Sequence, residues 1–398
     1  MNLFEQRFQS KAGLLDGIRL FNEFGSVTIE EEIGGIPYFV NEFWTAGQRK
    51  SHSIHEISYR ACFKPQLPEF FIKRLTQPGD TVHDPFMGRG TTPVQAALMH
   101  RRVLGNDINP LSTLITRPRL NSITLPEVRD ALAGVDWCAE EIKDEKLLTF
   151  YHPHTLKGLE SLKSWIRARE MDRVADWIRM VALSRLSGHS PGFFSARSMP
   201  PNQAVSIHAQ ERINRRLGQQ PPKRDIPAII LNKTRSLLRH GCLQSSADQR
   251  LFAEVAWNTR DIENASVDLV VTSPPFLDIV NYASDNWLRC WFAEIDASAV
   301  GIKLQRSASG WRKMVRRTLR ELARILRSGG HIAFEVGEIR NSTLLLERLV
   351  WEAADGLAFK RLGVMVNEQS FTKTSNCWGM VNGRRGTNSN RIVLLRKN

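Results

Sequence analysis

The segment between residues 81 and 108 constrains the fold more strongly than any other part of this 398-residue chain. Residues 81–86 (TVHDPF) have the composition of a short strand, and the glycines of residues 88–90 (GRG) allow a sharp turn after it. Pro93 suits the first turn of a helix that the preceding threonines can cap, and residues 102–108 (RVLGNDI) predict a second strand. This order of strand, glycine loop, helix and strand is the start of a doubly wound α/β sheet.

A ligand site is predicted at the glycine loop. Gly88 and Gly90 let the backbone bend and approach a ligand closely. The loop lacks the third glycine of a dinucleotide fingerprint, and no Gly-Lys-Ser/Thr of a phosphate-binding loop follows. Asp107 ends the next strand, about 20 residues further on, where an acid accepts hydrogen bonds from ribose hydroxyls. A glycine pair alone more often forms a plain turn, but the whole pattern favours a nucleoside ligand without phosphates.

A second motif follows another predicted strand, residues 267–272 (VDLVVT). Its β-branched apolar run suits a strand that is covered on both faces. Ser273, Pro274, Pro275 and Phe276 come next, and the two prolines end the strand because neither can donate a backbone hydrogen bond. The turn is either a structural strand ending, with the phenylalanine folded into the core, or part of a ligand site beside the glycine loop.

The remaining patterns divide the chain into four parts. Strands are predicted at residues 251–257, 331–337 and 391–397, so the two ends of the chain share one sheet. Apolar residues recur at helical spacing between them, as at Leu156, Leu159, Leu162 and Ile166. The predicted parts are an N-terminal extension with a hairpin at Gly34-Gly35 (1–54), a first sheet half (55–119), a mostly helical insertion (120–250) and a second sheet half (251–398).

Charge and composition favour a polyanionic partner. The net charge is +14, and residues 151–250 hold 17 Lys and Arg against 7 Asp and Glu. A second basic cluster, residues 311–327, is equally well explained as a solvated helix face. No apolar run could span a membrane and the start lacks a secretory signal, so we expect a cytoplasmic, nucleoid-associated protein with no membrane partner. The five cysteines have no zinc spacing, and no metal site is predicted.

The two motifs together resemble those of the amino-methyltransferases of DNA, which use S-adenosylmethionine. DPFMGRGTT is similar to their cofactor motif, and TSPPF is similar to their catalytic motif. Residues 58–75 resemble the segment that covers the methionine end of the cofactor, with Lys64 and Pro65 matching only loosely. The resemblance implies a Rossmann-like class I methyltransferase sheet with helices on both faces. Residues 55–119 then form the cofactor-binding half and residues 251–398 the catalytic half.

The resemblance also assigns roles to individual residues. It implies that Asp107 holds the ribose and that Asp261 lies near the adenine ring, although an exposed acid at a helix start explains Asp261 equally well. The other residues that it places at or beside the cofactor are Asp84, Phe86, Gly88, Gly90, Thr91 and Thr92.

The catalytic turn is expected to face the exocyclic amine of a base. Ser273 Oγ and the Pro274 carbonyl can accept hydrogen bonds from that amine, held in place by the prolines. Phe276 offers a face on which a flipped base can stack. No cysteine follows a proline, so a covalent enzyme intermediate is not expected. A serine at the first position favours N4 of cytosine, with N6 of adenine as the alternative.

The insertion between the motifs is expected to recognise double-stranded DNA. Its loop around residues 188–203 contains side chains that can read or wedge into DNA, or that form a buried pair beside a structural loop: Phe193, Phe194, Arg197, Asn202 and Gln203. A cognate restriction endonuclease is a further expected partner, and the oligomeric state stays open. The competing interpretations are an RNA methyltransferase and an inactive DNA-binding subunit.

Overall fold

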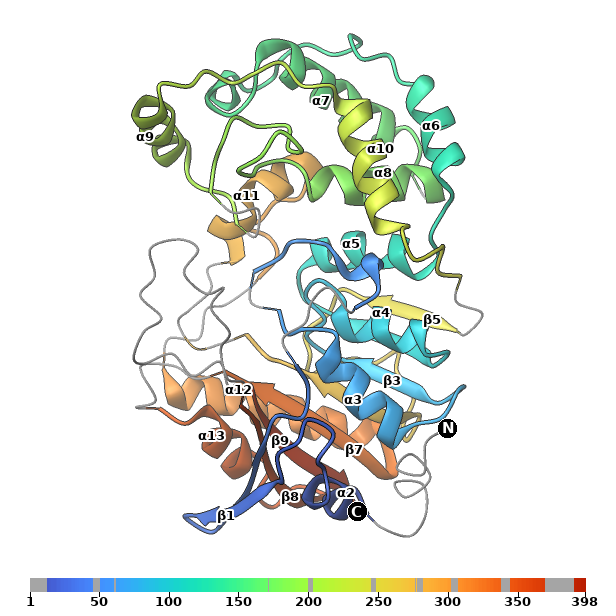
Figure 1. Cartoon of the computed structure of the whole chain (residues 1–398), viewed down its shortest axis with the longest axis vertical. Helices are drawn as coiled ribbons and strands as arrows, with labels where there is room; N and C mark the ends of the chain where they lie inside the picture. The colour runs from blue at the N-terminus through green and yellow to red at the C-terminus, as the bar shows by residue number, and fades with distance from the viewer. Residues whose placement is uncertain are drawn as a thin grey trace.

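The protein is built around one sheet that carries a lobe of helices at its upper end (Figure 1). The computed structural model describes residues 13–45, 51–60, 62–170, 172–199, 203–244, 248–275, 277, 282–301, 307–337, 344–368 and 390–398. Within these residues the sheet has nine strands in the order β1-β2-β8-β9-β7-β6-β3-β4-β5. Their bounds are β1 Ile29–Ile33, β2 Ile36–Asn41, β3 Thr81–Asp84, β4 Arg102–Asn106, β5 Gln249–Phe252, β6 Val267–Thr272, β7 Leu326–Val336, β8 Phe359–Asn367 and β9 Asn390–Lys397.

The strands that carry the predicted motifs run in one direction. β3 pairs in parallel with β4 and β6, and β6 pairs in parallel with β7. β9 is antiparallel to both β7 and β8. The carboxyl ends of β3, β4, β6 and β7 therefore meet at one edge of the sheet, where open α/β sheets bind their ligands.

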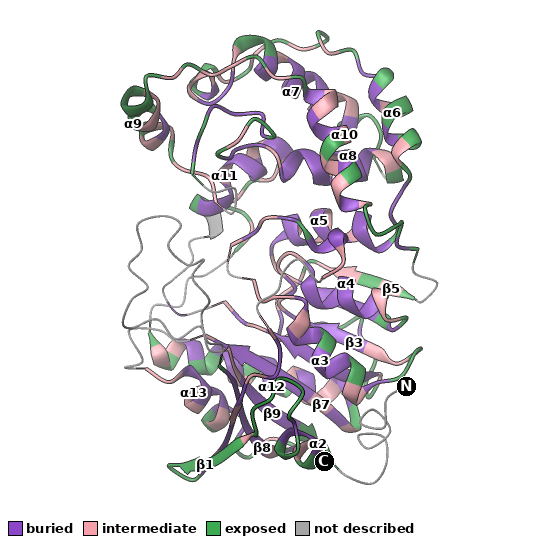
Figure 2. Ribbon diagram, in the orientation of Figure 1, coloured by how far each residue is buried: buried purple, intermediate pink, exposed green. Residues whose placement is uncertain are grey.

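Helices cover both faces of the sheet, as the fold prediction required. One face carries α3 (Gln66–Leu75), α4 (Thr91–Leu98) and α5 (Pro110–Leu120), and the other carries α12 (Ala308–Ile325) and α13 (Leu346–Ala353). β6 shows why its sequence is so apolar: Leu269 and Val271 belong to the first core, and Val267 and Val270 belong to the second. The predicted α/β fold is confirmed, and Figure 2 shows the central strands buried between helices with exposed outer faces, whereas the edge strand β1 is exposed.

The predicted helical insertion forms a lobe whose core is continuous with that of the first sheet face. It contains α6 (Leu125–Ala133), η3 (Glu145–Thr149), α7 (Pro153–Arg167), α8 (Arg173–Leu183), α9 (Ile207–Leu217) and α10 (Ile226–Leu237). The apolar positions of α7 that the periodicity identified are all buried. α11 (Tyr282–Ala293) also packs into this lobe, although it follows the Ser-Pro-Pro turn in sequence (Figure 1). Trp287 of α11 donates a hydrogen bond to the Val205 carbonyl at 3.0 Å.

The N-terminal region is part of the sheet. A hairpin does form at Gly34 and Gly35, both of which have positive φ, and it joins β1 to β2. β2 then pairs in parallel with β8, a strand that the sequence analysis did not predict. α2 (Leu14–Arg19) precedes this hairpin. Among the described residues, no helix has the length and apolar character needed to cross a membrane.

Candidate active site

The two motifs lie side by side at the carboxyl edge of the sheet. Thr272 Oγ1 at the end of β6 donates a hydrogen bond of 2.6 Å to Asp84 Oδ1 at the end of β3, 188 residues away in the chain. Thr92 Oγ1 donates to the Val271 carbonyl at 3.0 Å. Parallel pairing of β3 with β6 thus brings the glycine loop next to the Ser-Pro-Pro turn.

Asp84 is a buried acid with one carboxyl oxygen that has no partner among the described residues. Its side chain is only 1% exposed, and burial raises the pKa of its carboxyl to about 7 despite hydrogen bonds from Thr272 and the Phe86 amide. Oδ2 of Asp84 is buried and accepts no hydrogen bond from any described residue. A buried carboxyl oxygen without a partner is costly, so a cationic ligand group would satisfy it.

The glycine loop has the shape that the sequence indicated. Gly88 and Gly90 have φ values of 50° and 74°, which favour glycine. An added Cβ at Gly90 would collide with the side chain of Thr116, whereas one at Gly88 would make only ordinary van der Waals contact, with Tyr59 at 3.9 Å and the Phe86 carbonyl at 4.0 Å. Gly90 is itself the N-cap of α4 and makes no side-chain cap, so the prediction that Thr91 or Thr92 caps this helix is wrong. Both threonines are buried in the first turn, where their hydroxyls bind other partners.

Asp107 is held beside the glycine loop by backbone donors. The Gly88 amide donates to Asp107 Oδ2 at 2.8 Å and the Asn109 amide donates to Oδ1 at 2.9 Å. Burial raises the pKa of the Asp107 carboxyl, and these two donors oppose the rise. The carboxyl is therefore fixed in orientation next to the open side of Gly88. Phe86 is half-buried next to Asp84, to which its amide donates at 3.1 Å.

The Ser-Pro-Pro turn is held by a side chain from α12, on the face of the sheet that α12 and α13 cover. Trp311 Nε1 on α12 donates to the Pro275 carbonyl at 2.9 Å, and Pro274 is buried. Ser273 is half-buried, and its hydroxyl donates a hydrogen bond to the carboxylate of Glu335 on β7. The fourth residue of the predicted motif, Phe276, lies outside the described residues.

Glu335 is a functional candidate that the sequence analysis missed. It is 4% exposed, and burial raises its pKa, while hydrogen bonds from Ser273 and Asn390 lower it. The Asn390 Nδ2 donor lies 3.0 Å from Glu335 Oε1. The available signal was an acid in the middle of an apolar strand, AFEVG, where a charge is rarely placed without a reason.

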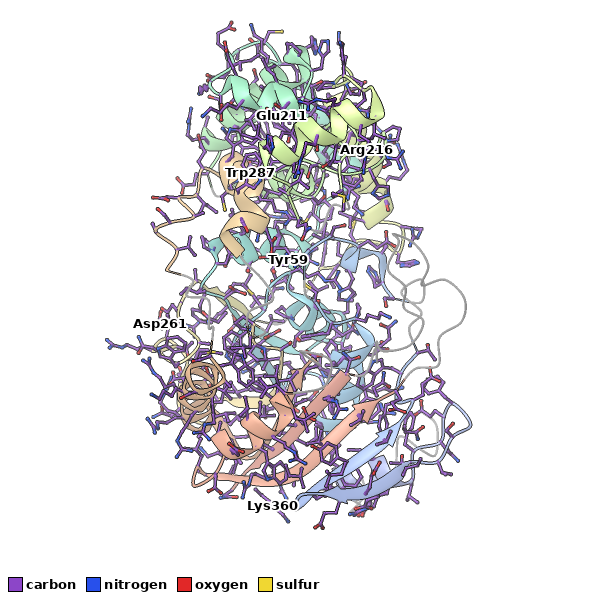
Figure 3. All side chains as sticks on the ribbon, turned by 90° about the vertical axis from the view of Figure 1, so that its left-hand side faces the viewer. Tyr59, Glu211, Arg216, Asp261, Trp287 and Lys360 are labelled. Atoms are coloured by element: carbon purple, nitrogen blue, oxygen red, sulfur yellow. The ribbon has the colours of Figure 1, made fainter. Side chains whose placement is uncertain are left out.

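Asp261 is not brought together with the other predicted residues. Its side chain is exposed, and its turn packs against the end of α12, where Arg324 Nη1 donates to the Ile262 carbonyl at 2.8 Å. That turn precedes β6, so it lies at the amino edge of the sheet, opposite the glycine loop. Figure 3 shows Asp261 on the outer surface, well apart from Tyr59.

Another acid, Glu254, lies at the carboxyl edge of the sheet, where the acid near the adenine ring was expected. The Asp107 amide donates to the Phe252 carbonyl at 3.2 Å, which places the end of β5 beside Asp107. Asn106 then exchanges two hydrogen bonds with the backbone of Glu254, at 2.9 and 3.0 Å. Oε2 of Glu254 is buried and has no hydrogen-bond partner among the described residues. An acid with a spare acceptor therefore lies next to the predicted ribose site.

The segment predicted to cover the cofactor lies against the glycine loop. Arg89 Nη1 donates to the Ile57 carbonyl and Nη2 donates to the Phe63 carbonyl, each at 3.1 Å. Tyr59 Oη accepts a hydrogen bond of 3.1 Å from Asn109, two residues after Asp107. Of the loosely matched pair, Pro65 is the N-cap of α3, and burial lowers the pKa of Lys64.

In the helical lobe, the two phenylalanines are structural. Phe193 and Phe194 are buried, and the Arg185 guanidinium lies 4.1 Å from the centre of the Phe193 ring. They are therefore not available to wedge into DNA, because they build the core of their own loop. Arg197 is exposed, Gln203 is half-buried and Asn202 lies outside the described residues.

The two basic clusters differ in how their charges are used. Arg212, Arg215 and Arg216 on α9 are exposed and form no ion pair with any described residue. On α12, Arg312 pairs with Glu352 at 2.7 Å and Arg324 pairs with Glu321 at 2.7 Å. No group of His, Cys, Asp or Glu suited to a metal ion occurs in the part of the chain that the structure describes.

Known proteins match part of this chain. Residues 36–114 match the family model described as DNA methylase. The type II methyltransferase M.MjaII of Methanocaldococcus jannaschii is 41% identical over 81 residues, which are 20% of this chain and 15% of the relative. The orphan methyltransferase M.BamHII of Bacillus amyloliquefaciens is 37% identical over 78 residues, or 19% of this chain and 29% of the relative. The chain thus spans less than a third of the length of these relatives.

Solved structures give weaker likenesses. TrmN from Thermus thermophilus is 12% identical with a TM-score of 0.33, covering 85% of this chain and 50% of that chain. An rRNA methylase from Streptococcus thermophilus is 9% identical with a TM-score of 0.31, covering 85% and 98%. Neither TM-score is high enough to support a substrate. The sequence match supports the resemblance stated for the glycine-loop half, because residues 36–114 match the family model described as DNA methylase.

Proposed function

We propose that this protein transfers a methyl group from S-adenosylmethionine to the exocyclic amine of a flipped base in double-stranded DNA, with N4 of cytosine as the acceptor. The observation that carries the proposal is the Ser273 hydroxyl, which donates to the buried Glu335 carboxylate beside the glycine loop. The match of residues 36–114 to DNA methylases supports the choice of DNA.

The residues at the carboxyl edge fit S-adenosylmethionine by their chemistry. Gly88 leaves room for the ligand, and Asp107 accepts from the ribose hydroxyls. The unpartnered oxygen of Asp84 suits the ammonium of the amino-acid end. We assign the acceptor of the adenine amine to Glu254 rather than Asp261, because Oε2 of Glu254 is buried without a partner among the described residues. When bound, the cofactor supplies a methyl group on a positively charged sulfur.

The Ser-Pro-Pro turn prepares the acceptor amine. An exocyclic amine is a poor nucleophile because its lone pair is conjugated with the ring. The Ser273 hydroxyl proton is committed to Glu335, so the lone pairs of Oγ are free to accept a hydrogen bond from the amine. The Pro274 carbonyl accepts the second one. Both acceptors are fixed before the base arrives, which is the preorganisation that lowers a barrier.

The Ser273–Glu335 pair also gives the lost proton a path. As the amine nitrogen bonds to the methyl carbon, it must release one proton. Ser273 Oγ accepts that proton and passes its own to the Glu335 carboxylate. The raised pKa of buried Glu335 makes it a better proton acceptor than an exposed glutamate.

The amine of adenine could use the same turn, so the product decides between the two bases. The experiment is methylation of duplex DNA by the purified protein, followed by nucleoside digestion and mass spectrometry. We expect 4-methylcytosine. Detection of 6-methyladenine would overturn the assignment of the base and keep the mechanism. Methylated RNA with no methylated DNA would overturn the proposed function.

A further inference from the structure

Two arginines meet beneath the covering segment, and no acid among the described residues balances their charge. Arg119 on α5 is 0% exposed, and Arg89 lies between the two glycines of the loop, half-buried. Arg119 Nη2 donates to the backbone carbonyl of Arg89, and the two guanidinium groups are near enough to repel one another. Neither forms an ion pair with any residue that the structure describes.

Backbone carbonyls occupy only some of the donors of these arginines. Arg119 donates to the carbonyls of Ile115 and Ile54, in addition to that of Arg89. Arg89 donates to the carbonyls of Ile57 and Phe63 and to Thr91 Oγ1. Each guanidinium has five N–H groups, so each has donors left over.

No residue that the structure describes neutralises the charge of this pair. Burial, followed by repulsion from Arg89, lowers the pKa of Arg119 to about 9, which leaves it charged at neutral pH. A neutral amide side chain could also donate to carbonyls, without bringing a buried charge. Burying a cation without an anion is unfavourable, which indicates that an anion belongs here.

Arg89 reaches from the glycine loop to the covering segment, whereas Asp84 lies at the end of β3. Cys62 of the covering segment accepts a hydrogen bond from the Arg89 amide, which fixes the segment over the loop. Asp84 therefore offers an anion from β3, and Arg89 offers a cation beneath the segment. An amino-acid zwitterion needs one neighbour of each sign.

We infer that Arg89 binds the α-carboxylate of the cofactor's amino-acid end and that Arg119, buried behind it, is a positioning residue that adds to the positive potential. This inference rests on the proposed cofactor and is independent of the base that is methylated. The covering segment encloses the pair, which suits a small carboxylate better than a phosphate of a DNA duplex.

The test compares two ligands that differ in one group. S-adenosylhomocysteine carries the carboxylate, and its decarboxylated analogue, 5′-deoxy-5′-(3-aminopropylthio)adenosine, keeps the ammonium and the nucleoside. Calorimetry with wild-type protein should show about ten- to a hundredfold tighter binding of S-adenosylhomocysteine, as expected for a charge-assisted hydrogen bond. In Arg89→Gln that preference should collapse to near unity, with little change for the analogue.

Two further variants keep the inference falsifiable if Arg89→Gln disturbs the loop. Arg89→Lys keeps the charge but loses the forked contacts to Ile57 and Phe63, and should retain part of the preference for the carboxylate. Arg117→Gln removes an arginine of α5 that pairs with Asp176 at 2.8 Å, and should leave the preference unchanged.

The outcomes separate the inference from the proposed function. Equal loss of affinity for both ligands in Arg89→Gln and Arg89→Lys would overturn the inference and leave Arg89 a structural residue. Wild-type protein that binds the nucleoside ligands without preference would also overturn it, with the cofactor assignment intact. Failure of wild-type protein to bind S-adenosylhomocysteine would overturn the proposed cofactor, and this inference with it.

Discussion

The carboxyl edge of the sheet and the outer face of α9 use polar side chains in opposite ways. At the sheet edge, Asp84, Ser273 and Glu335 are buried or half-buried and have fixed hydrogen-bond partners. On α9, Arg212 and Arg216 extend into solvent without any ion pair among the described residues. Chemistry requires groups held in place before the substrate arrives, whereas association with a polyanion requires charge that is still free to pair.

The attachment of α9 supports this contrast. Gln210, Asn214 and Gln219 donate to the carbonyls of Arg197 and Thr149 at 2.7 to 3.0 Å and so fasten the helix to its lobe. Amide side chains therefore hold α9 to the lobe, and the arginines of α9 are not needed for this attachment. Figure 3 shows Glu211 and Arg216 of this helix at the top of the molecule.

The largest expected effect comes from Ser273→Ala at the sheet edge. Loss of this hydroxyl removes an acceptor for the amine and the first step of the proton path. We expect the rate of methyl transfer in single-turnover experiments to fall by about a hundred- to a thousandfold, typical for removal of one preorganised group. Cofactor and DNA affinities, measured by calorimetry and by fluorescence anisotropy, should stay within about twofold, because the lost contact acts in the chemical step.

Ser273→Thr is the matched variant, since it keeps a hydroxyl at the same position. It should retain more activity than Ser273→Ala. If Ser273→Ala lost DNA binding and methyl transfer to the same degree, the sheet edge would not act in the chemical step alone. That result would contradict the contrast between the sheet edge and α9.

The second prediction concerns the pH dependence of cofactor binding. Burial raises the pKa of Asp84 to about 7, so the free protein holds this carboxyl protonated below that pH. A ligand ammonium prefers the ionised form, and binding must then release the proton. The affinity for S-adenosylhomocysteine should therefore rise as the pH increases from 6 to 8 and level off above about 8.

The stability of the free protein should depend on pH in the opposite direction and decrease as the pH rises. The pKa of Asp84 is higher in the folded state than the ordinary 3.8, so its contribution favours folding at low pH and is lost as the pH rises towards 7. Asp84→Asn should bind the ligand with an affinity that is flat between pH 6 and 8. A variant that keeps the wild-type pH profile would exclude Asp84 as the titrating group.

Local sequence predicted the sheet edge well because each motif constrains its own backbone. Gly88 and Gly90 need positive φ, and the prolines after Ser273 end a strand; neither fact depends on distant residues. The pairing of β2 with β8 could not be predicted in this way, since it joins residues more than 300 positions apart. β8 also begins FKRLG, with charged residues in its first half, and so gave a weak strand signal.

The failure to predict Glu335 and Glu254 and the wrong location expected for Asp261 have the same cause. Glu335 contacts Ser273 only because β7 pairs with β6, and this pairing could not be predicted from the sequence. Asp261 was assigned from a loose match, and its place before β6 puts it at the amino edge. Glu254 follows β5, whose position beside β4 is set by the sheet order. Residues whose roles depend on strand neighbours thus need the structure.

The smallest effect is expected from substitutions on α9, which test whether its exposed arginines bind DNA. Neutralising Arg212, Arg215 and Arg216 to glutamine should reduce the slope of log affinity for DNA against log salt by up to about 3, because each phosphate contact contributes roughly 0.9. Single-turnover transfer at saturating DNA should change little. The matched control neutralises Lys313, Arg317 and Arg320 on α12, which are equally exposed and form no ion pair with any described residue. That control should leave the slope unchanged. Equal slopes for wild-type protein and the α9 variant, or a larger decrease for the α12 variant, would move the DNA-binding surface away from α9 and towards the sheet.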